Sequence, residues 1–351
     1  MASTGRALTF EEKKSRILDI NTELKFKCID AANPGNIKSA RETFIDAVEK
    51  RRNDPTYIEQ GGSSLCGPAA FLYCVAREKP DDFAHYALDL ALEGKGSLGN
   101  LIVEPGSACL GTERLQIGQG TKAGTQGTKA RTITPADWVT LASLRDSTGR
   151  VSSMDSVTSD LGGMTHPDAL AGWFGGTGWF RDVRNEARIA GTHDPLRHLL
   201  GINSLPLSYV CLLINANIMT GGVVFRIPTH WVVLGDGAGK GGGSNGNDGS
   251  VIRIGMPGTT GTPVQHEIAE RAFCLPDSPA CVSSNDPRAA RRAALEKGKL
   301  NFRVYSWGGN DYDYERAGRR GIKTVDFKHP GGLTVEKFLP AYFGYVTAAV
   351  K

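Results

Sequence analysis

The sequence has no long hydrophobic run. Across 351 residues, no window approaches the roughly 18 apolar residues that a membrane-spanning helix needs. The first residues, Met1 to Lys14, also lack the apolar core of a secretory signal peptide. We therefore expect a soluble chain made in the cytoplasm, with no membrane span and no signal peptide. Export by a leaderless, contact-dependent secretion system stays open, because the sequence contains no other targeting signal.

Charge of one sign is not concentrated in any block. The chain has 41 Lys and Arg residues against 37 Asp and Glu residues, which gives a formal net charge of +4. These charges are spread along the sequence, whereas nucleic-acid binding favours a basic patch or stripe. We therefore expect no nucleic-acid partner.

Regularly spaced cysteines are lacking as well. Seven cysteines at irregular intervals do not indicate a disulfide framework in a chain of this size. Cys274 and Cys281 are near enough in sequence to bridge a loop, but free thiols are expected. There is no Cys-x-x-Cys pair and no His-Glu-x-x-His motif, and the glycines around Lys240 have the wrong spacing for a phosphate-binding loop. We predict neither a metal nor a cofactor.

Helix-like patterns fill the first part of the chain. Apolar residues at three- and four-residue spacing predict surface helices over Phe10–Leu24 and Ser39–Arg52. Another helix is expected from Pro80 to a stop at Gly94, and one more starts at Thr134 with Pro135 in its first turn. The stretch from 162 to 178 mixes aromatic residues with glycines and favours no assignment.

Strand-like patterns follow Pro206. Short β-branched and aromatic runs bounded by Gly and Pro predict the strands of one antiparallel sheet: Tyr209–Ile218, Gly222–Ile227, Thr229–Leu234, Ser250–Ile254 and Asn301–Ser306. The last segment, Thr334–Val350, is expected to be an amphipathic helix that carries Phe338, Tyr342 and Tyr345. Helices first and strands later are typical of an α+β domain.

Cys66 lies where a Gly/Ser-rich loop runs into an apolar stretch that ends near Ala76. A helix without a polar face belongs in the interior of a protein. At the start of such a helix, the backbone N–H groups and the helix dipole favour a thiolate and lower the pKa of the thiol. Cys74, two turns further along, has only apolar neighbours and is expected to be inert. Cys66 is therefore the candidate nucleophile.

A nucleophilic cysteine needs a base, and His230 is the best candidate among seven histidines. It follows Pro228-Thr229 and opens a predicted strand whose next residues, Trp231 to Leu234, are apolar. This placement would hold the ring at the edge of a sheet. The other histidines lie on a helix, in loops or without clear strand context, and are interpreted as surface or packing residues.

Gln60 precedes Cys66 by six residues, and the string Gln-Gly-x-x-x-x-Cys-Gly-Pro-Ala-Ala resembles the active-site segment of papain-like cysteine peptidases, closest to those that process bacteriocin leaders. Ser306-Trp307-Gly308 is also similar to the end of a later strand in that family. The resemblance covers residues 59–76 and, more loosely, 209–308. It implies catalytic roles for Cys66 and His230, and an oxyanion hole made by the Gln60 side chain and the Cys66 backbone N–H.

The resemblance also implies a domain plan. A papain-like catalytic domain over residues 56–351 would follow a helical extension over residues 1–55, with insertions at about 94–206 and 274–299. Such enzymes orient the histidine with an Asn or Asp, but Tyr305 stands directly before Ser306-Trp307-Gly308. The orienting group is therefore open among Asn215, Asn217, Asp236 and a backbone carbonyl.

Three functions are compatible with these residues. The first is a thiol hydrolase that cleaves an amide bond of a protein or peptide, including a peptidoglycan peptide, as a bacterial secreted effector or toxin. A secretion-system component or an immunity protein would then be a further partner. The second is a deamidase or transglutaminase-like enzyme that modifies a target protein through the same Cys-His thioester chemistry. The third is a non-catalytic binding protein on a papain-like scaffold.

Overall fold

The computed structural model describes residues 6–61, 63–117, 131–148, 165–190, 194–202, 208–220, 224, 226–234, 253–255, 296–301, 303–306, 322–324 and 333–351. The chain divides into two compact units. The first comprises residues Met1–Trp179 and Trp307–Arg320, and the second comprises Phe180–Ser306 and Gly321–Lys351. The helical N-terminal half and an antiparallel sheet confirm the predicted α+β class.

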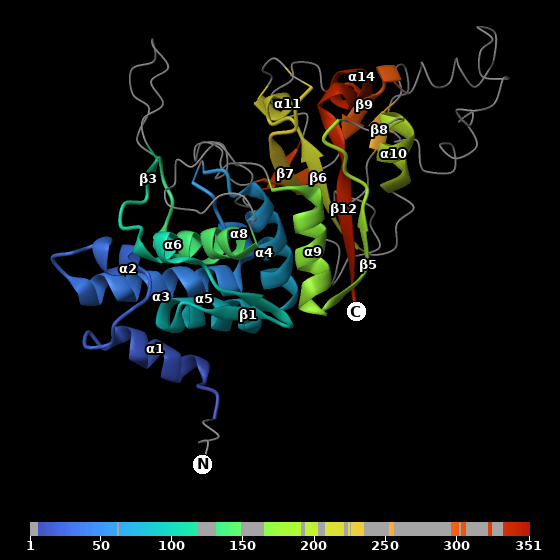
Figure 1. Ribbon diagram of the computed structural model, residues 1–351. Coiled ribbons are helices and arrows are strands. Elements are labelled where there is room, and N and C mark those ends of the chain that lie inside the picture. Colours follow the sequence, from blue (N-terminus) through green and yellow to red (C-terminus); the bar gives the residue numbers. More distant parts are fainter. Residues whose placement is uncertain are drawn as a thin grey trace, which may run out of the picture. The chain divides into compact units, whose positions relative to one another are not determined.

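The first unit is built mainly from helices (Figure 1). α1 (Phe10–Leu18) begins after a capping box between Thr9 and Glu12 and ends six residues before its predicted end. α3 (Ile37–Asn53) contains the whole predicted range and is capped by Asn36. Both α1 and α3 pack against α5 (Pro80–Glu93). A boundary at residue 55 stays a prediction.

Helix α4 (Cys66–Glu78) is the central helix of this unit. It packs against helices α3, α5 and α9 (Pro167–Thr177), the short 3-10 helix η1 (Pro55–Tyr57) and the π-helical turn η2 (Trp138–Ala142). Every residue from Cys66 to Ala76 is buried, which confirms the prediction of a buried helix headed by Cys66. α5 follows at once and ends at Gly94, whose φ of 69° is the left-handed conformation that glycine adopts without strain.

The remaining elements of the first unit are short. The predicted helix start at Thr134 is confirmed, because its side chain caps α7 by accepting from the Asp137 N–H. Helix α9 was not anticipated, although His166 and Pro167 at its start are a typical helix-initiation pair. The other elements are α2 (Lys27–Ala31), η1 (Pro55–Tyr57), β1 (Gly96–Leu98), β2 (Leu101–Val103), α6 (Ser107–Gly111), β3 (Gln116–Ile117), β4 (Arg131–Thr132), α7 (Pro135–Asp137), η2 (Trp138–Ala142), α8 (Ser143–Thr148) and α9 (Pro167–Thr177).

The second unit contains a six-stranded sheet in the order β11-β10-β7-β6-β12-β5, with every neighbouring pair antiparallel. Strands that follow each other in the sequence are not always adjacent in the sheet, because the last strand of the chain, β12, lies between β5 and β6. The strands are β5 (Phe180–Asn185), β6 (Ser208–Ile214), β7 (His230–Leu234), β10 (Arg303–Tyr305), β11 (Ile322–Thr324) and β12 (Tyr342–Val350).

Short helices and a second, two-stranded sheet complete this unit. The two strands β8 (Arg253–Gly255) and β9 (Lys299–Asn301) pair with each other, which corrects the expectation that all strands belong to one sheet. The described residues of the predicted strand 222–227 are not in a strand. The helices are α10 (Pro195–Gly201), α11 (Asn217–Thr220), α14 (Val335–Phe338) and η8 (Leu339–Ala341).

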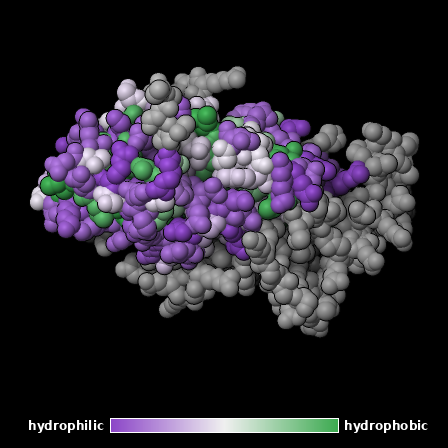
Figure 2. Space-filling view, turned by 90° about the horizontal axis from the view of Figure 1, so that it is seen from below, coloured by the Kyte–Doolittle hydropathy of each residue, from purple (hydrophilic) through white to green (hydrophobic). Residues whose placement is uncertain are grey.

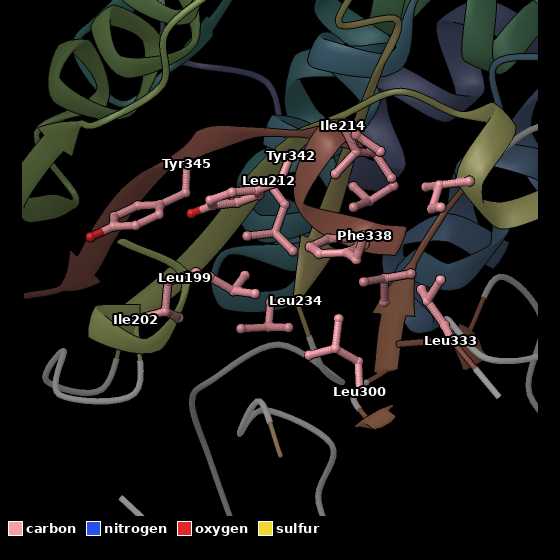
Figure 3. Close-up of a cluster of buried hydrophobic side chains, with 14 of the residues drawn as sticks. Leu199, Ile202, Leu212, Ile214, Leu234, Leu300, Leu333, Phe338, Tyr342 and Tyr345 are labelled. Carbon is pink, nitrogen blue, oxygen red and sulfur yellow. The ribbon is translucent and has the colours of Figure 1, made fainter. Parts of the chain in front are cut away.

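A buried hydrophobic cluster lies between the sheet and these short helices. Figure 3 shows Leu199 of α10 and Ile202, the residue after this helix, on the same side of the sheet as Leu212, Leu234 and other strand residues. Removing such side chains from water is the main free energy that holds a sheet to its covering helices. The cluster includes the start of β12 at Tyr342, so the C-terminal strand is part of the core of this unit.

The prediction of a C-terminal amphipathic helix is wrong. Only Val335–Phe338 is α-helical, and the residues from Tyr342 to Val350 form strand β12, the longest strand of the sheet. Eight of its nine residues are buried, because β5 and β6 pair with its two edges and the core covers it. Gly344, with φ 103°, lies at a shift in register, where a Cβ would meet the Glu186 carbonyl oxygen at 2.3 Å.

The face shown in Figure 2 is mostly polar over its coloured residues, with hydrophobic residues in small separate spots. Across the described part of the chain, no helix combines the length and the apolar character that a membrane span requires. In the described part of the chain, the buried cysteines that form no disulfide are Cys28, Cys66, Cys74, Cys109 and Cys211. Cys274 and Cys281, for which a bridge was weighed, lie outside the described residues.

Candidate active site

The loop before Cys66 has a defined turn at Gln60. The Ser63 N–H donates to the Gln60 carbonyl oxygen at 2.9 Å, and the Ser63 hydroxyl donates to the same oxygen at 2.6 Å. Gly61 has a φ of 61°, the left-handed conformation that suits glycine in such a turn. The Gln60 side chain is buried with the turn. The backbone of Gln60 is therefore fixed, which limits the positions that its side-chain amide can take.

Cys66 occupies the first position of helix α4, directly after Leu65. The first turn of a helix directs its backbone N–H groups outward and carries the positive end of the dipole. No acidic residue lies in this turn to oppose that field. Cys66 is 3% exposed, so its thiol is shielded from bulk water. The helix start and its field favour a thiolate at this position, whereas burial opposes the charge.

Gly67 lets the chain approach closely beside the cysteine. A Cβ built at this position would meet the Oγ1, Cβ and Cγ2 atoms of Thr165 at 2.2, 2.3 and 2.7 Å. Real Cβ atoms do not come so near, so any other residue at Gly67 would push the first turn of α4 away from Thr165. Glycine after Cys66 is therefore required by packing as well as by the motif.

Both ends of the loop are bound by one segment, the continuous stretch α7-η2-α8. The Glu59 N–H donates to the Asp137 carboxylate at 3.2 Å. At the other end, Nη1 of Arg145 donates to the Ser64 carbonyl oxygen at 2.6 Å. Asp137 and Arg145 were not among the predicted site residues, and they lie within the predicted insertion at 94–206. This insertion therefore supports the loop that carries Gln60.

Asp137 is itself fixed by a buried ion pair. Arg51 of α3 donates from Nε to Asp137 Oδ1 at 2.8 Å and from Nη2 to Oδ2. Thr134 adds a hydroxyl donor to Oδ2 at 2.8 Å. The Asp137 side chain has no exposed surface, so its charge depends on these donors. The carboxylate that accepts the Glu59 N–H is therefore held in place by Arg51 of helix α3.

His230 is the first residue of β7, as predicted, and is paired with Ile214 of β6. It is 8% exposed. Its Nε2 atom lies 2.9 Å from the hydroxyl oxygen of Ser306, at the residue that follows β10. Because β10 pairs directly with β7, the two side chains are brought together by the sheet. This contact holds the Nε2 side of the ring.

Ser306 was not among the four groups considered for orienting His230. The Asn215 side chain donates from Nδ2 to the Ile227 carbonyl oxygen at 2.8 Å and accepts at Oδ1 from the Asn217 N–H at 3.0 Å. Asp236 lies outside the described residues. The signal for Ser306 was present in the Ser-Trp-Gly string, whose first residue makes the contact.

The predicted site residues divide between the two units. Cys66 and Gln60 belong to the first unit, and His230 belongs to the second. The pairing of the Cys66 sulfur with the His230 ring stays a prediction. As for metals, the described residues contain no group of three or more His, Cys, Asp or Glu side chains arranged to hold an ion.

Comparisons of this chain with protein-family models, with curated proteins and with solved structures return no match.

Proposed function

We propose that the protein is a papain-like thiol hydrolase that cleaves an amide bond of a protein or peptide. The observation that carries this proposal is the position of Cys66 at the start of the buried helix α4, behind a loop fixed at both ends. A structural cysteine needs only burial. A nucleophile also needs a helix dipole and fixed donors beside it, and this position has the dipole and the fixed Gln60 turn.

The proposed reaction proceeds in two steps. The Cys66 thiolate attacks the carbonyl carbon, a C–S bond forms, and the π electrons move to the oxygen, which accepts hydrogen bonds from the Gln60 amide and the Cys66 backbone N–H. When the C–N bond breaks, its electron pair stays on nitrogen, which takes a proton from the His230 imidazolium. Water then attacks the thioester, His230 takes a proton from it, and sulfur leaves as the thiolate.

Ser306 would select the reactive tautomer of His230. If the Nε2–H donates to the Ser306 hydroxyl, the lone pair remains on Nδ1, which can then exchange a proton with the sulfur and the leaving group. A serine hydroxyl is neutral and can also donate, so it fixes the tautomer less strictly than a carboxylate does. The proposed histidine is thus oriented by a weak partner.

Replacing Ser306 by alanine is expected to lower kcat/KM by about tenfold, because the ring loses the contact that orients it. KM should change little, since Ser306 does not contact substrate in this proposal. Ser306→Thr, which keeps the hydroxyl, should recover most of the rate. Steady-state kinetics on all three proteins, with thermal melts to verify folding, provides the measurement. Equal rates for the wild type and Ser306→Ala would remove Ser306 from the mechanism.

A peptide library prepared from a digested bacterial proteome tests the function itself. Incubated with the full-length protein and analysed by mass spectrometry, it should yield new peptide termini that are missing when Cys66→Ala is used. Glutamine deamidation, seen as a gain of about one mass unit, would identify the modifying enzyme instead, by the same thioester chemistry. Identical peptide sets with the wild type and Cys66→Ala would exclude amide hydrolysis of such peptides and favour the binding protein.

A further inference from the structure

Helix α1 is attached to the rest of the first unit largely through charged side chains. Of its nine residues, two are buried, and one of these is a lysine: Lys13 and Ile17. Lys14 pairs with Glu49 of α3 at 2.6 Å, but this pair is partly exposed. Because water already solvates such a pair, it stabilises the docking of α1 only weakly. The docking therefore depends strongly on how the buried charge of Lys13 is compensated.

The Lys13 ammonium group contacts two side chains of α5. It forms an ion pair with Asp89 and lies 3.1 Å from Nδ1 of His85. An ammonium group has three donors and no acceptor, so Nδ1 supplies the lone pair and the His85 ring is neutral in this contact. Phe10, also on α1, makes an edge-to-face contact with the ring at a centroid distance of 6.0 Å. His85 thus contacts α1 at two points.

Protonation of His85 is incompatible with this arrangement. It replaces the lone pair on Nδ1 by an N–H group, which cannot accept from Lys13. It also places two cations side by side in a half-buried site, where the carboxylate of Asp89 already compensates the charge of Lys13. The contact between His85 and α1 therefore exists only while the ring is neutral.

The charged groups that face this contact come from three helices: Lys13 of α1, Arg52 of α3, and Asp81, Asp82 and Asp89 of α5. Burial lowers the pKa of His85 and Lys13 lowers it further, whereas the three carboxylates oppose this without reversing it. A histidine whose pKa is lower in the docked state stabilises that state fully above its ordinary pKa of about 6.5. The stabilisation is lost as the pH falls below that value.

We propose that the Lys13–His85 contact is a pH-sensitive clasp, which holds α1 against α5 while His85 is neutral and releases the N-terminal part of α1 when His85 is protonated. Arg41 of α3 donates to the carbonyl oxygens of Ile17 and Asp19, so the C-terminal end of α1 stays attached. This inference is independent of the proposed function, because none of these residues takes part in the proposed reaction.

Hydrogen exchange of the full-length protein at about pH 7.5 and about pH 5.5 tests the clasp, since histidine is the side chain that ordinarily titrates between these values. The exchange is read by peptide mass spectrometry and corrected for the intrinsic effect of pH on amide exchange. The protection factors of the α1 amides should fall by about fivefold at the lower pH, because the released His85 ring takes up a proton. The amides of the central helix α4 should keep their protection.

His85→Asn removes the titration and keeps an acceptor. The asparagine Oδ1 can accept from Lys13 in place of Nδ1, so α1 should stay docked at both pH values. His166→Asn is the matched control in the same unit. The His166 side chain is 60% exposed and caps α9 by accepting from the Asp168 N–H, which an asparagine also does. This control should show the same fall in protection as the wild type.

Equal protection of α1 at the two pH values in the wild type would overturn the clasp. A fall that persists in His85→Asn, or one that α4 shares to the same extent, would also overturn it, since the latter pattern indicates global unfolding in acid. Thermal melts verify that the variants are folded. Titration of the wild-type histidines by NMR needs no variant: a pKa of His85 at or above the ordinary value would contradict the proposal.

Discussion

Cys66→Ala and His230→Asn are each expected to lower kcat/KM for peptide cleavage by about a thousandfold or more, and the double variant is expected to be no slower than the slower single one. The reason is that nucleophile and base act as one unit: without the base no group protonates the leaving nitrogen, and without the sulfur the base has no proton to move. Steady-state kinetics on a peptide cleaved by the wild type measures all three rates.

Cys74→Ala is the matched control for Cys66→Ala. Cys74 lies on the same helix, eight residues further along, and has no exposed surface. Its removal leaves a small cavity, which lowers stability by about 1 kcal/mol but leaves kcat/KM within about twofold.

Two losses of kcat/KM that multiply in the double variant of Cys66 and His230 would show that the two residues act independently. That result would contradict a shared mechanism.

Asp137→Ala is expected to lower the free energy of unfolding by about 3–5 kcal/mol. The substitution leaves the Arg51 guanidinium buried without its carboxylate, and a buried charge that loses its partner costs that much in measured cases. It also removes the acceptor of the Glu59 N–H, so the loop at Gln60 loses its first anchor. Urea denaturation followed by circular dichroism measures the stability.

Asp81→Ala controls for the loss of a carboxylate from an ion pair in the same unit. Asp81 pairs with Arg52, the residue next to Arg51, but its side chain is 70% exposed. Exposed pairs contribute about 0–1 kcal/mol, because water already solvates both charges. If Asp137→Ala cost no more than Asp81→Ala, the Arg51–Asp137 pair would not be an anchor, and its role in fixing the loop would have to be abandoned.

The first half of the fold was predictable because its signals are local. Thr134 and Pro135, Pro80 and Gly94 mark helix ends through capping chemistry that involves only neighbouring residues. The start of α4 at Cys66 follows similarly from a Gly/Ser loop that meets an apolar stretch. Such features need no knowledge of the rest of the chain, and the structure reproduces them within one or two residues.

Strand β12 could not be predicted because the strands that pair with it, β5 and β6, lie far from it in the sequence. Phe338, Tyr342 and Tyr345 have the spacing of a helix face, and two alanines near the C-terminus fit a helix as well. The strand is covered on both faces, so the alternation of polar and apolar residues that marks a half-exposed strand is missing. Only its partners β5 and β6 decide its conformation.

The support of the candidate site was missed for a related reason. Ser306 meets His230 across 76 residues of sequence, and Arg145 reaches Ser64 across 81. Motif spacing identifies residues that share one loop or one helix start, as Gln60 and Cys66 do. It carries no information on which distant strand end or helix supplies the orienting and charged partners.

The wide turn η2 (Trp138–Ala142) stands between Asp137 and Arg145, and the Tyr86 hydroxyl donates to the Thr140 carbonyl oxygen at 2.8 Å within it. Each helical residue advances the direction of its side chain by about 100°. Shortening this stretch by one residue would swing the guanidinium more than a quarter circle away from Ser64. The number of residues between Asp137 and Arg145 therefore determines whether both ends of the loop before Cys66 can be bound by this segment at once.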